Sequence, residues 1–280
     1  RQSDRLVMLT LAVSGFAAMV YEVSWTRALT AIIGSSTYSF AIMLVTFLVG
    51  IAMGSSWAGR FRPSASLRLL GLFQLGIAAG GLVFLIGYLV APYLLISLIR
   101  ALFYSFPAVL TIQFIVCSSL MVLATFFMGA TFPVAGQLFF SRIEILGRRI
   151  GSAYSINTVG AILGSLTAGF FLVPFLGTER TVLVGLFLNS ALALFLLAEI
   201  KGAFAIARWA AIGLLLTATV SMRGELFWDP SSMDRGILIY ARQFETRPEL
   251  LIEEHYTDTD VVFFAEGKNA SISVRRGNNY

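Results

Sequence analysis

The stretch GIAMGSSWAG, residues 50–59, returns 110 positions later as GAILGSLTAG, residues 160–169. Both segments follow the template G-x-x-x-G-S-x-x-A-G. Its five fixed positions are Gly50, Gly54, Ser55, Ala58 and Gly59 in the first copy, and Gly160, Gly164, Ser165, Ala168 and Gly169 in the second. Small residues three or four positions apart share one face of a helix and let two membrane helices approach closely. The template therefore predicts helix-packing faces at these residues.

The composition sets the class of protein. Of the 280 residues, 58% are hydrophobic and only 12% are charged, with a mean hydropathy of +0.84. Soluble domains carry about 25% charged residues. The chain is therefore predicted to be a polytopic membrane protein whose first partner is the lipid bilayer. Its net charge of +5 comes mainly from arginine. In a membrane protein this excess indicates topology and lipid contact rather than nucleic-acid binding.

Residues that commonly carry out chemistry are scarce. Cys117 is the only cysteine, which excludes an intrachain disulfide, and His255 is the only histidine, which excludes a His-rich metal site. The sequence contains no carboxylate dyad, phosphate-cradling loop or ligand cluster, so we predict no catalytic, cofactor or metal site in it. Because the chain begins with Arg1 rather than Met, we expect it to be processed or to be part of a longer protein.

Seven stretches reach the roughly 20 apolar residues that a membrane helix needs: 6–27, 37–59, 67–91, 108–136, 150–173, 181–199 and 204–221. One side of these spans carries ten basic residues: Arg1, Arg5, Arg60, Arg62, Arg68, Arg142, Arg148, Arg149, Lys201 and Arg208. The other side carries three before the tail: Arg27, Arg100 and Arg180. Basic residues favour the cytoplasmic side. We therefore expect an inner (plasma) membrane protein of a prokaryote, with a cytoplasmic N-terminus and the residues after 221 on the other side.

The two copies of the template lie in the second and fifth spans, which cross the membrane in opposite directions. This arrangement is typical of an inverted repeat of three plus three helices, here followed by one more helix. The stretch GSSWAGRFRPSASLR, residues 54–68, resembles the loop between helices two and three of major facilitator transporters, which are built in this way. We predict an all-α domain over residues 1–221 that resembles half of a facilitator. The alternative is that the match reflects only the small residues common in apolar chains.

Four polar residues within or near the spans form a candidate intramembrane site: Glu22, Arg27, Asn157 and Thr158. Ionisable groups inside a membrane are costly and count as functional candidates. Five residues advance a helix by about 140°, so Glu22 and Arg27 do not face each other. Glu22 is predicted to hydrogen-bond another helix, to serve a substrate or proton, or to contact a lipid headgroup. Asn157 and Thr158 are predicted to join helices or, alternatively, to bind a ligand.

The chain changes character after residue 221. Residues 222–260 are predicted to form an extramembrane linker, and residues 261–280 contain VVFFAEG and ASISVRR, which predict a β-hairpin. A two-stranded hairpin is only marginally stable alone. It must therefore dock on the membrane domain, pair with a partner, or begin a larger domain.

Several motifs together resemble one family, the multi-spanning membrane proteins with a C-terminal spermidine synthase-like (aminopropyltransferase) domain. They are GFAAMVYEVSWTRALTAIIGSS, FLVGIAMGS, MGATFPVAG, GRRIGSAYSINTVGAILGSLTAGFFLVPFLGTERT, WDP with DRGILIYA, and FFAEGKNASISVRR. The resemblance implies a membrane module followed by the first hairpin of the synthase-like domain. Decarboxylated S-adenosylmethionine would bind in the part of that domain that follows. The resemblance places no catalytic or cofactor residue in this chain.

These observations leave three hypotheses for function. The leading one is a membrane module that anchors and orients a soluble aminopropyltransferase-like domain. The second is a facilitator-like transport module that uses Glu22 and the glycine-lined helices. The third is a non-catalytic accessory subunit that binds other membrane proteins. Seven spans would place the synthase-like domain away from its cytoplasmic donor, so either there is one span fewer, or the domain has another ligand or is non-catalytic.

Overall fold

The computed structural model describes residues 2–61, 64–101, 105–139, 146–198, 205–221, 228, 259–267 and 271–277. The helices are α1 (Gln2–Ile33), α2 (Thr37–Phe61), α3 (Leu67–Ala101), α4 (Phe106–Phe139), α5 (Leu146–Thr167), the π-helical turn η2 (Ala168–Leu172), α6 (Val173–Leu176), α7 (Thr178–Leu197) and α8 (Ala205–Ser221). Two strands, β1 (Thr259–Glu266) and β2 (Ser271–Gly277), follow. The predicted all-α membrane domain is confirmed in class.

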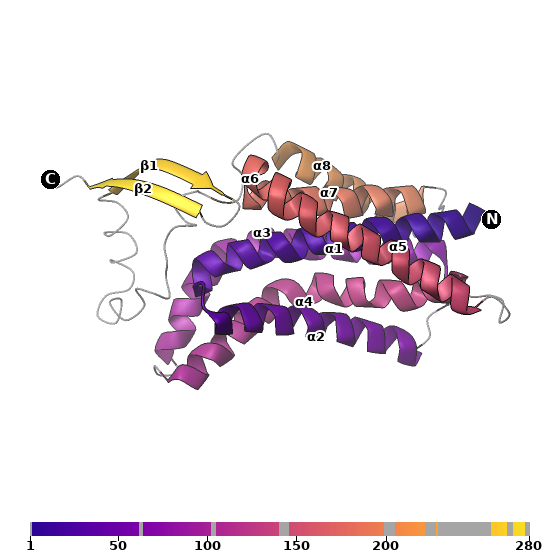
Figure 1. Cartoon of the computed structure of the whole chain (residues 1–280), viewed down its shortest axis with the longest axis horizontal. Coiled ribbons are helices and arrows are strands. Elements are labelled where there is room, and N and C mark those ends of the chain that lie inside the picture. The colour runs from indigo at the N-terminus through magenta and orange to yellow at the C-terminus, as the bar shows by residue number, and fades with distance from the viewer. Residues whose placement is uncertain are drawn as a thin grey trace.

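Six helical segments in the described residues are long and apolar enough to cross a membrane: 4–33, 37–60, 67–95, 106–138, 147–176 and 178–197. The predicted seventh span, 204–221, is not among these six segments. It corresponds to α8, whose 17 residues rise only about 26 Å at 1.5 Å per residue. The hydrocarbon core of a bilayer is about 30 Å thick. Even so, α8 runs back beside α7 from the end of the bundle that holds the N-terminus (Figure 1).

Two of the helices that extend beyond their predicted bounds contain a proline near the end of the predicted span. Helix α3 continues ten residues beyond the predicted end at 91 and includes Pro92. The fifth span continues from α5 through η2 into α6, where Pro174 is near the start. A proline ring lacks an N–H and clashes with the carbonyl four residues earlier. The wider π turn, in which the N–H of Val173 donates to the carbonyl of Ala168, absorbs this misfit without ending the span.

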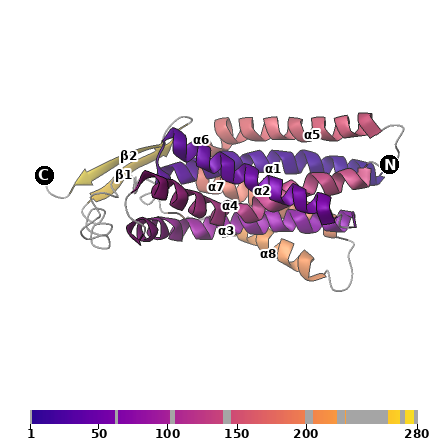
Figure 2. The ribbon, with the colours of Figure 1, turned by 90° about the horizontal axis from the view of Figure 1, so that it is seen from below.

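The helices pack as two parallel pairs around a central pair. In Figure 1, α1 and α5 lie along each other and run from the N-terminal end towards the hairpin, whereas α2 and α4 run together in the opposite direction. Figure 2 shows α5 at the edge of the bundle. In an apolar 18-residue stretch of each span, 56% of the residues of α3 and of α7 are buried inside the protein, against 33% for α2 and 22% for the fifth span. Helices α3 and α7 therefore form the centre, and α2 and α5 are outer helices.

The strands β1 and β2 pair antiparallel, with Thr259 opposite Gly277 and Glu266 opposite Ser271. The register is irregular between Val261 and Phe263. The strand pair lies at the end of the bundle opposite the N-terminus (Figure 1). Residues 268–270 and most of the predicted linker 222–260, including His255, lie outside the described residues.

Candidate functional site

The glycines of the two templates let the two helices within each parallel pair, α2 with α4 and α1 with α5, pack closely. A Cβ atom placed on Gly54 of α2 would lie 1.8 Å from the backbone oxygen of Phe126 in α4. A Cβ on Gly164 of α5 would lie 2.3 Å from the backbone oxygen of Phe16 in α1. Both distances are far below a van der Waals contact, so only glycine allows these backbones to approach so closely.

The first glycine of each template has the same role. A Cβ on Gly50 would lie 1.9 Å from the hydroxyl of Thr125, and one on Gly160 would lie 2.2 Å from the backbone oxygen of Ala12. The third glycines, Gly59 and Gly169, differ, because no described heavy atom lies within 4 Å of the position that their Cβ would occupy. Each template thus has two packing glycines and one that packs against nothing described.

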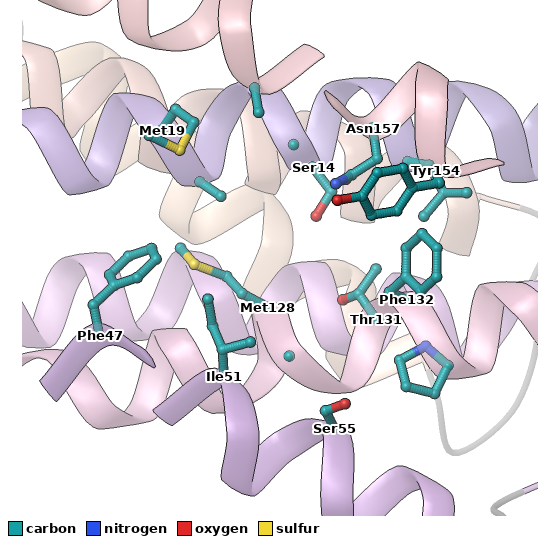
Figure 3. A pocket seen from close by; sticks show the side chains of 16 residues that line it. Ser14, Met19, Phe47, Ile51, Ser55, Met128, Thr131, Phe132, Tyr154 and Asn157 are labelled. Carbon is teal, nitrogen blue, oxygen red and sulfur yellow. The ribbon is translucent and has the colours of Figure 1, made fainter. Parts of the chain in front are cut away.

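A cavity of about 310 Å³ lies between the two pairs, lined by residues of α1, α2, α4 and α5. Figure 3 shows that its two ends differ. Ser14, Thr131, Tyr154 and Asn157 gather towards one end, and the other end is apolar, lined by Met19, Phe47, Ile51 and Met128. The polar lining residues lie nearer the N-terminal end of the bundle than Met19, Ile51, Met128 and Ala161 do on the same helices, and Leu11, Phe132 and Pro133 also line that end. The cavity therefore has a polar end and an apolar end along the bundle axis.

The residues proposed from sequence as one polar site are in different places. Asn157 lines the cavity, whereas Thr158 is not among the lining residues. Arg27 bonds the hairpin. Glu22 lies one helical turn beyond Ala18, on the cavity-facing side of α1 but past the apolar end. No described residue forms a hydrogen bond or ion pair with its carboxylate. Of the two template serines, Ser55 lines the cavity, and Ser165 donates to the carbonyl of Ile162 in its own helix.

A second candidate site joins the strand pair to the bundle. We call it the hairpin dock: Arg27 of α1, Thr178 of α7, and Glu266 and Gly267 of the hairpin. The carboxylate of Glu266 accepts hydrogen bonds from the backbone N–H and, at 2.9 Å, from the hydroxyl of Thr178. The guanidinium of Arg27 donates to the carbonyl of Gly267. Thr178 is the first residue of α7, where backbone N–H groups lack partners within the helix. Glu266 therefore caps α7 from a distant part of the chain.

The turn before α7 makes this capping possible. Gly177 adopts φ +84°, a conformation that side chains rarely take, and it turns the chain sharply from α6 into α7. A Cβ on Gly177 would lie 3.1 Å from a carboxylate oxygen of Glu266. Glycine therefore serves both the turn and the close approach of the carboxylate.

The electrostatics of the dock favour a proton on Glu266. Burial raises the pKa of this carboxyl, and the hydrogen bonds from Thr178 and the charge of Arg27 lower it by less. The carboxyl of docked Glu266 consequently holds its proton to a higher pH than a free, solvated glutamate does.

Trp228 provides a third contact between the tail and the bundle. Its side chain is buried, and its indole N–H donates to the backbone oxygen of Leu85 in α3 at 3.2 Å. Its ring packs on Tyr88 with a centroid separation of 4.2 Å. The hydroxyl of Tyr88 in turn donates to the carbonyl of Ala28 in α1. The tail is therefore held to α1, α3 and α7.

Sequence reasoning named one residue of each site, Asn157 of the cavity and Arg27 of the dock, and missed the others. For the cavity it missed Ser14 and Tyr154, although Ser14 adjoins Gly15, a small residue on α1. For the dock it missed Thr178 and Glu266. The pair Gly177–Thr178 at the start of an apolar run is a recognisable helix N-terminus, but nothing in the sequence names its distant acceptor.

The described residues contain no group of three or more histidine, cysteine, aspartate or glutamate side chains placed to hold a metal ion. Comparison of the chain with models of protein families, with curated proteins and with solved structures found no match. The resemblance to spermidine synthase-like membrane proteins therefore rests on the sequence motifs alone.

Proposed function

We propose that this chain is a membrane module that anchors and orients a soluble aminopropyltransferase-like domain, of which β1 and β2 form the beginning. The hairpin dock carries this proposal. It ties the strand pair to two different helices, through Arg27 to α1 and through Thr178 to α7. Attachment at two separate points restrains rotation as well as position, which a simple flexible tether would not do.

The surface of the strand pair supports the same proposal. Phe263 lies opposite Val274, and Ile272 is two residues along β2 from Val274, so the three side chains share one face. Each is at least half exposed. Two strands with an apolar face need further strands or a packing partner for stability. A soluble domain continuing from this hairpin would cover that face, and decarboxylated S-adenosylmethionine would bind within that domain.

Distance measurements between spin labels test the orienting role. Labels are placed at Ser35 and Ile272, both exposed, after replacement of the buried Cys117 by alanine. We expect a narrow distance distribution that broadens in Thr178→Val, because the hydroxyl bond to Glu266 is lost. Thr181→Val is the matched control, since its hydroxyl bonds only Gly177 in the adjoining turn. Equal widths in all three proteins would contradict the proposal.

The aminopropyltransferase-like part needs a separate test. Decarboxylated S-adenosylmethionine, added to the intact protein purified from its native membrane, should raise the unfolding temperature and support aminopropyl transfer to a diamine. Absence of both effects, with a narrow distance distribution retained, would leave an orienting module with a different or non-catalytic soluble partner.

A second candidate function is facilitator-like transport, and the cavity between the helix pairs favours it. We infer that α1–α3 and α4, α5 and α7 are two inverted triplets, with α8 as the extra helix. In support, α2 packs by glycine on α4 while α5 packs by glycine on α1, as exchange of the triplets requires. Binding sites at the interface of such repeats are common in transporters. Glu22→Gln should abolish uptake in proteoliposomes if this chain transports through a path that includes Glu22.

We also propose an orientation. The described basic residues Arg60, Arg68, Arg148 and Arg149 lie at the same end of the bundle as the N-terminus, and a cytoplasmic N-terminus follows from the positive-inside rule. The hairpin would then lie on the non-cytoplasmic side of a prokaryotic inner membrane. A reporter fused after Met222 tests this placement, and a cytoplasmic signal would contradict it.

Association with another membrane subunit, the third hypothesis, would be detected as co-purification of a stable partner.

A further inference from the structure

We propose that the cavity between the α1–α5 and α2–α4 pairs binds an uncharged amphiphile that enters sideways from the bilayer. The predicted ligand class is a single aliphatic chain with a hydroxyl, ester or amide head group. The head would lie at the polar end of the cavity, near Ser14 and Asn157, and the chain at the apolar end. This site is independent of the hairpin dock and of any soluble domain.

Unpartnered polar side chains indicate that a ligand or water must complete the site. Ser14 is only 7% exposed and lines the cavity, yet its hydroxyl has no hydrogen bond within the described part of the chain. Ser55, Tyr154 and Asn157 also line the cavity and are more exposed than Ser14, and their side chains likewise form no hydrogen bond with the described residues. At the depth of a bilayer core, water is scarce and each unpaired polar group is costly. A bound head group with both donors and acceptors would satisfy several of them together.

The depth of the cavity supports this environment. Its lining on α1 runs from Leu11 to Met19, about 10 to 22 Å from Asp4 at 1.5 Å per residue. Asp4 forms an ion pair with Arg149 at the N-terminal end of the bundle. The cavity therefore lies near the middle of a hydrocarbon core about 30 Å thick.

The lining also selects against charge. None of the 16 lining residues is Asp, Glu, Lys, Arg or His. An ion at this depth would need a counter-charge. The acid nearest along α1, Glu22, lies beyond the apolar end of the cavity, away from Ser14 and Asn157. Serine, threonine, tyrosine and asparagine both donate and accept hydrogen bonds, which matches a neutral head group.

The route into the cavity is lateral. Tyr154 lines the cavity but is 64% exposed on the outer helix α5, so the cavity reaches the outer surface of the bundle there. Within about one turn of Tyr154 on α5, Ile150 and Val159 are also exposed and apolar. Membrane lipid therefore surrounds the opening. The volume of about 310 Å³ is about twice that of an engineered protein cavity that binds benzene, which suits one chain.

Photolabelling tests the proposal. The protein in phosphatidylcholine nanodiscs is exposed to three dodecyl-chain probes with the same diazirine: a monoacylglycerol, a carboxylate and a trimethylammonium. Labelled peptides are mapped by mass spectrometry. We expect the monoacylglycerol probe to label segments 11–19 and 154–161, to be displaced by unlabelled monododecanoylglycerol, and to exceed both charged probes by about tenfold.

Variants sharpen this test. Asn157→Leu should reduce labelling by about tenfold, whereas Thr158→Leu, next to it but outside the lining, should leave labelling unchanged. Both variants are first checked for an unchanged elution profile and unfolding temperature. If Asn157→Leu does not fold, the competition measured on the native protein decides alone. Labelling that is not displaced, that spreads evenly over the lipid-facing helices, or that is equally strong with a charged probe would overturn the proposal.

Discussion

Substituting the template glycines one at a time tests the helix packing directly. In Gly54→Ala the new Cβ would lie 1.8 Å from the backbone oxygen of Phe126, and in Gly164→Ala it would lie 2.3 Å from that of Phe16. Ordinary contact begins near 3.4 Å. The two helices within a pair must therefore move apart locally, α2 from α4 by about 1.6 Å in Gly54→Ala and α5 from α1 by about 1.1 Å in Gly164→Ala. Backbone oxygens cannot rotate away as side chains can.

Overpacking of this kind costs about 1–3 kcal/mol. The better helix propensity of alanine offsets at most about 1 kcal/mol. Gly59→Ala and Gly169→Ala keep that gain without a clash, since no described heavy atom lies within 4 Å of the new Cβ. We expect Gly54→Ala to be the most destabilising, Gly164→Ala to follow, and Gly59→Ala and Gly169→Ala to match or exceed the native stability.

Thermal unfolding in detergent micelles, followed by tryptophan fluorescence with circular dichroism as a check, measures this order. About 2–4 °C is expected for each kcal/mol in a domain of this size. The packing described above would be refuted if Gly59→Ala lowered the unfolding temperature as much as Gly54→Ala. It would also be refuted if Gly54→Ala and Gly164→Ala were both as stable as the native protein.

Three further predictions concern the ends of the bundle. Because burial raises the pKa of docked Glu266, docking should be strongest when Glu266 is protonated and should weaken as the pH rises through the range between its free and docked pKa values. Hydrogen exchange of β1 and β2 should follow this change in the native protein and lose it in Glu266→Gln. Trp228→Phe should lower stability by about 1 kcal/mol, since the indole bond to Leu85 is lost, while Trp228→Ala should cost about 3–5 kcal/mol; thermal unfolding measures both. Asp4→Asn should change stability by less than about 1 kcal/mol in the same assay, because its 3.6 Å ion pair with Arg149 is partly exposed.

The sequence was sufficient to predict the membrane class and six of the spans, because long apolar runs have few alternatives to a membrane helix. The helical period also predicts that the template glycines do not all lie on one face of the helix. Gly54 lies four residues after Gly50, about 40° around the helix, so both share a face. Gly59 lies nine residues after Gly50, about 180° around, on the opposite face. The absence of close contacts at Gly59 follows from this geometry.

The hairpin dock and the cavity were beyond prediction from the sequence for a different reason. The dock joins residues 240 positions apart at Arg27 and Gly267 and 88 positions apart at Thr178 and Glu266. No local pattern specifies such pairs. The cavity depends on how far two helix pairs stand from each other. The glycine template predicts close approach within each pair but says nothing about the distance between the pairs.

The position of the dock along α1 also limits the number of membrane crossings, independently of the length of α8. Asp4, near the start of α1, and Arg27, which bonds the hairpin, are 23 residues apart on one continuous helix, a rise of about 35 Å. This exceeds the roughly 30 Å of a hydrocarbon core. If α1 crosses the membrane, the hairpin and the N-terminus must lie on opposite sides, and the crossings between them must be odd in number. Since six helices are long enough to cross, α8 would have to supply the seventh crossing, with help from its flanking residues or by local thinning of the bilayer, the usual response to a short helix. For the proposed synthase-like domain, the loss of one span would then not explain its separation from a cytoplasmic donor, and another ligand or a non-catalytic role would remain.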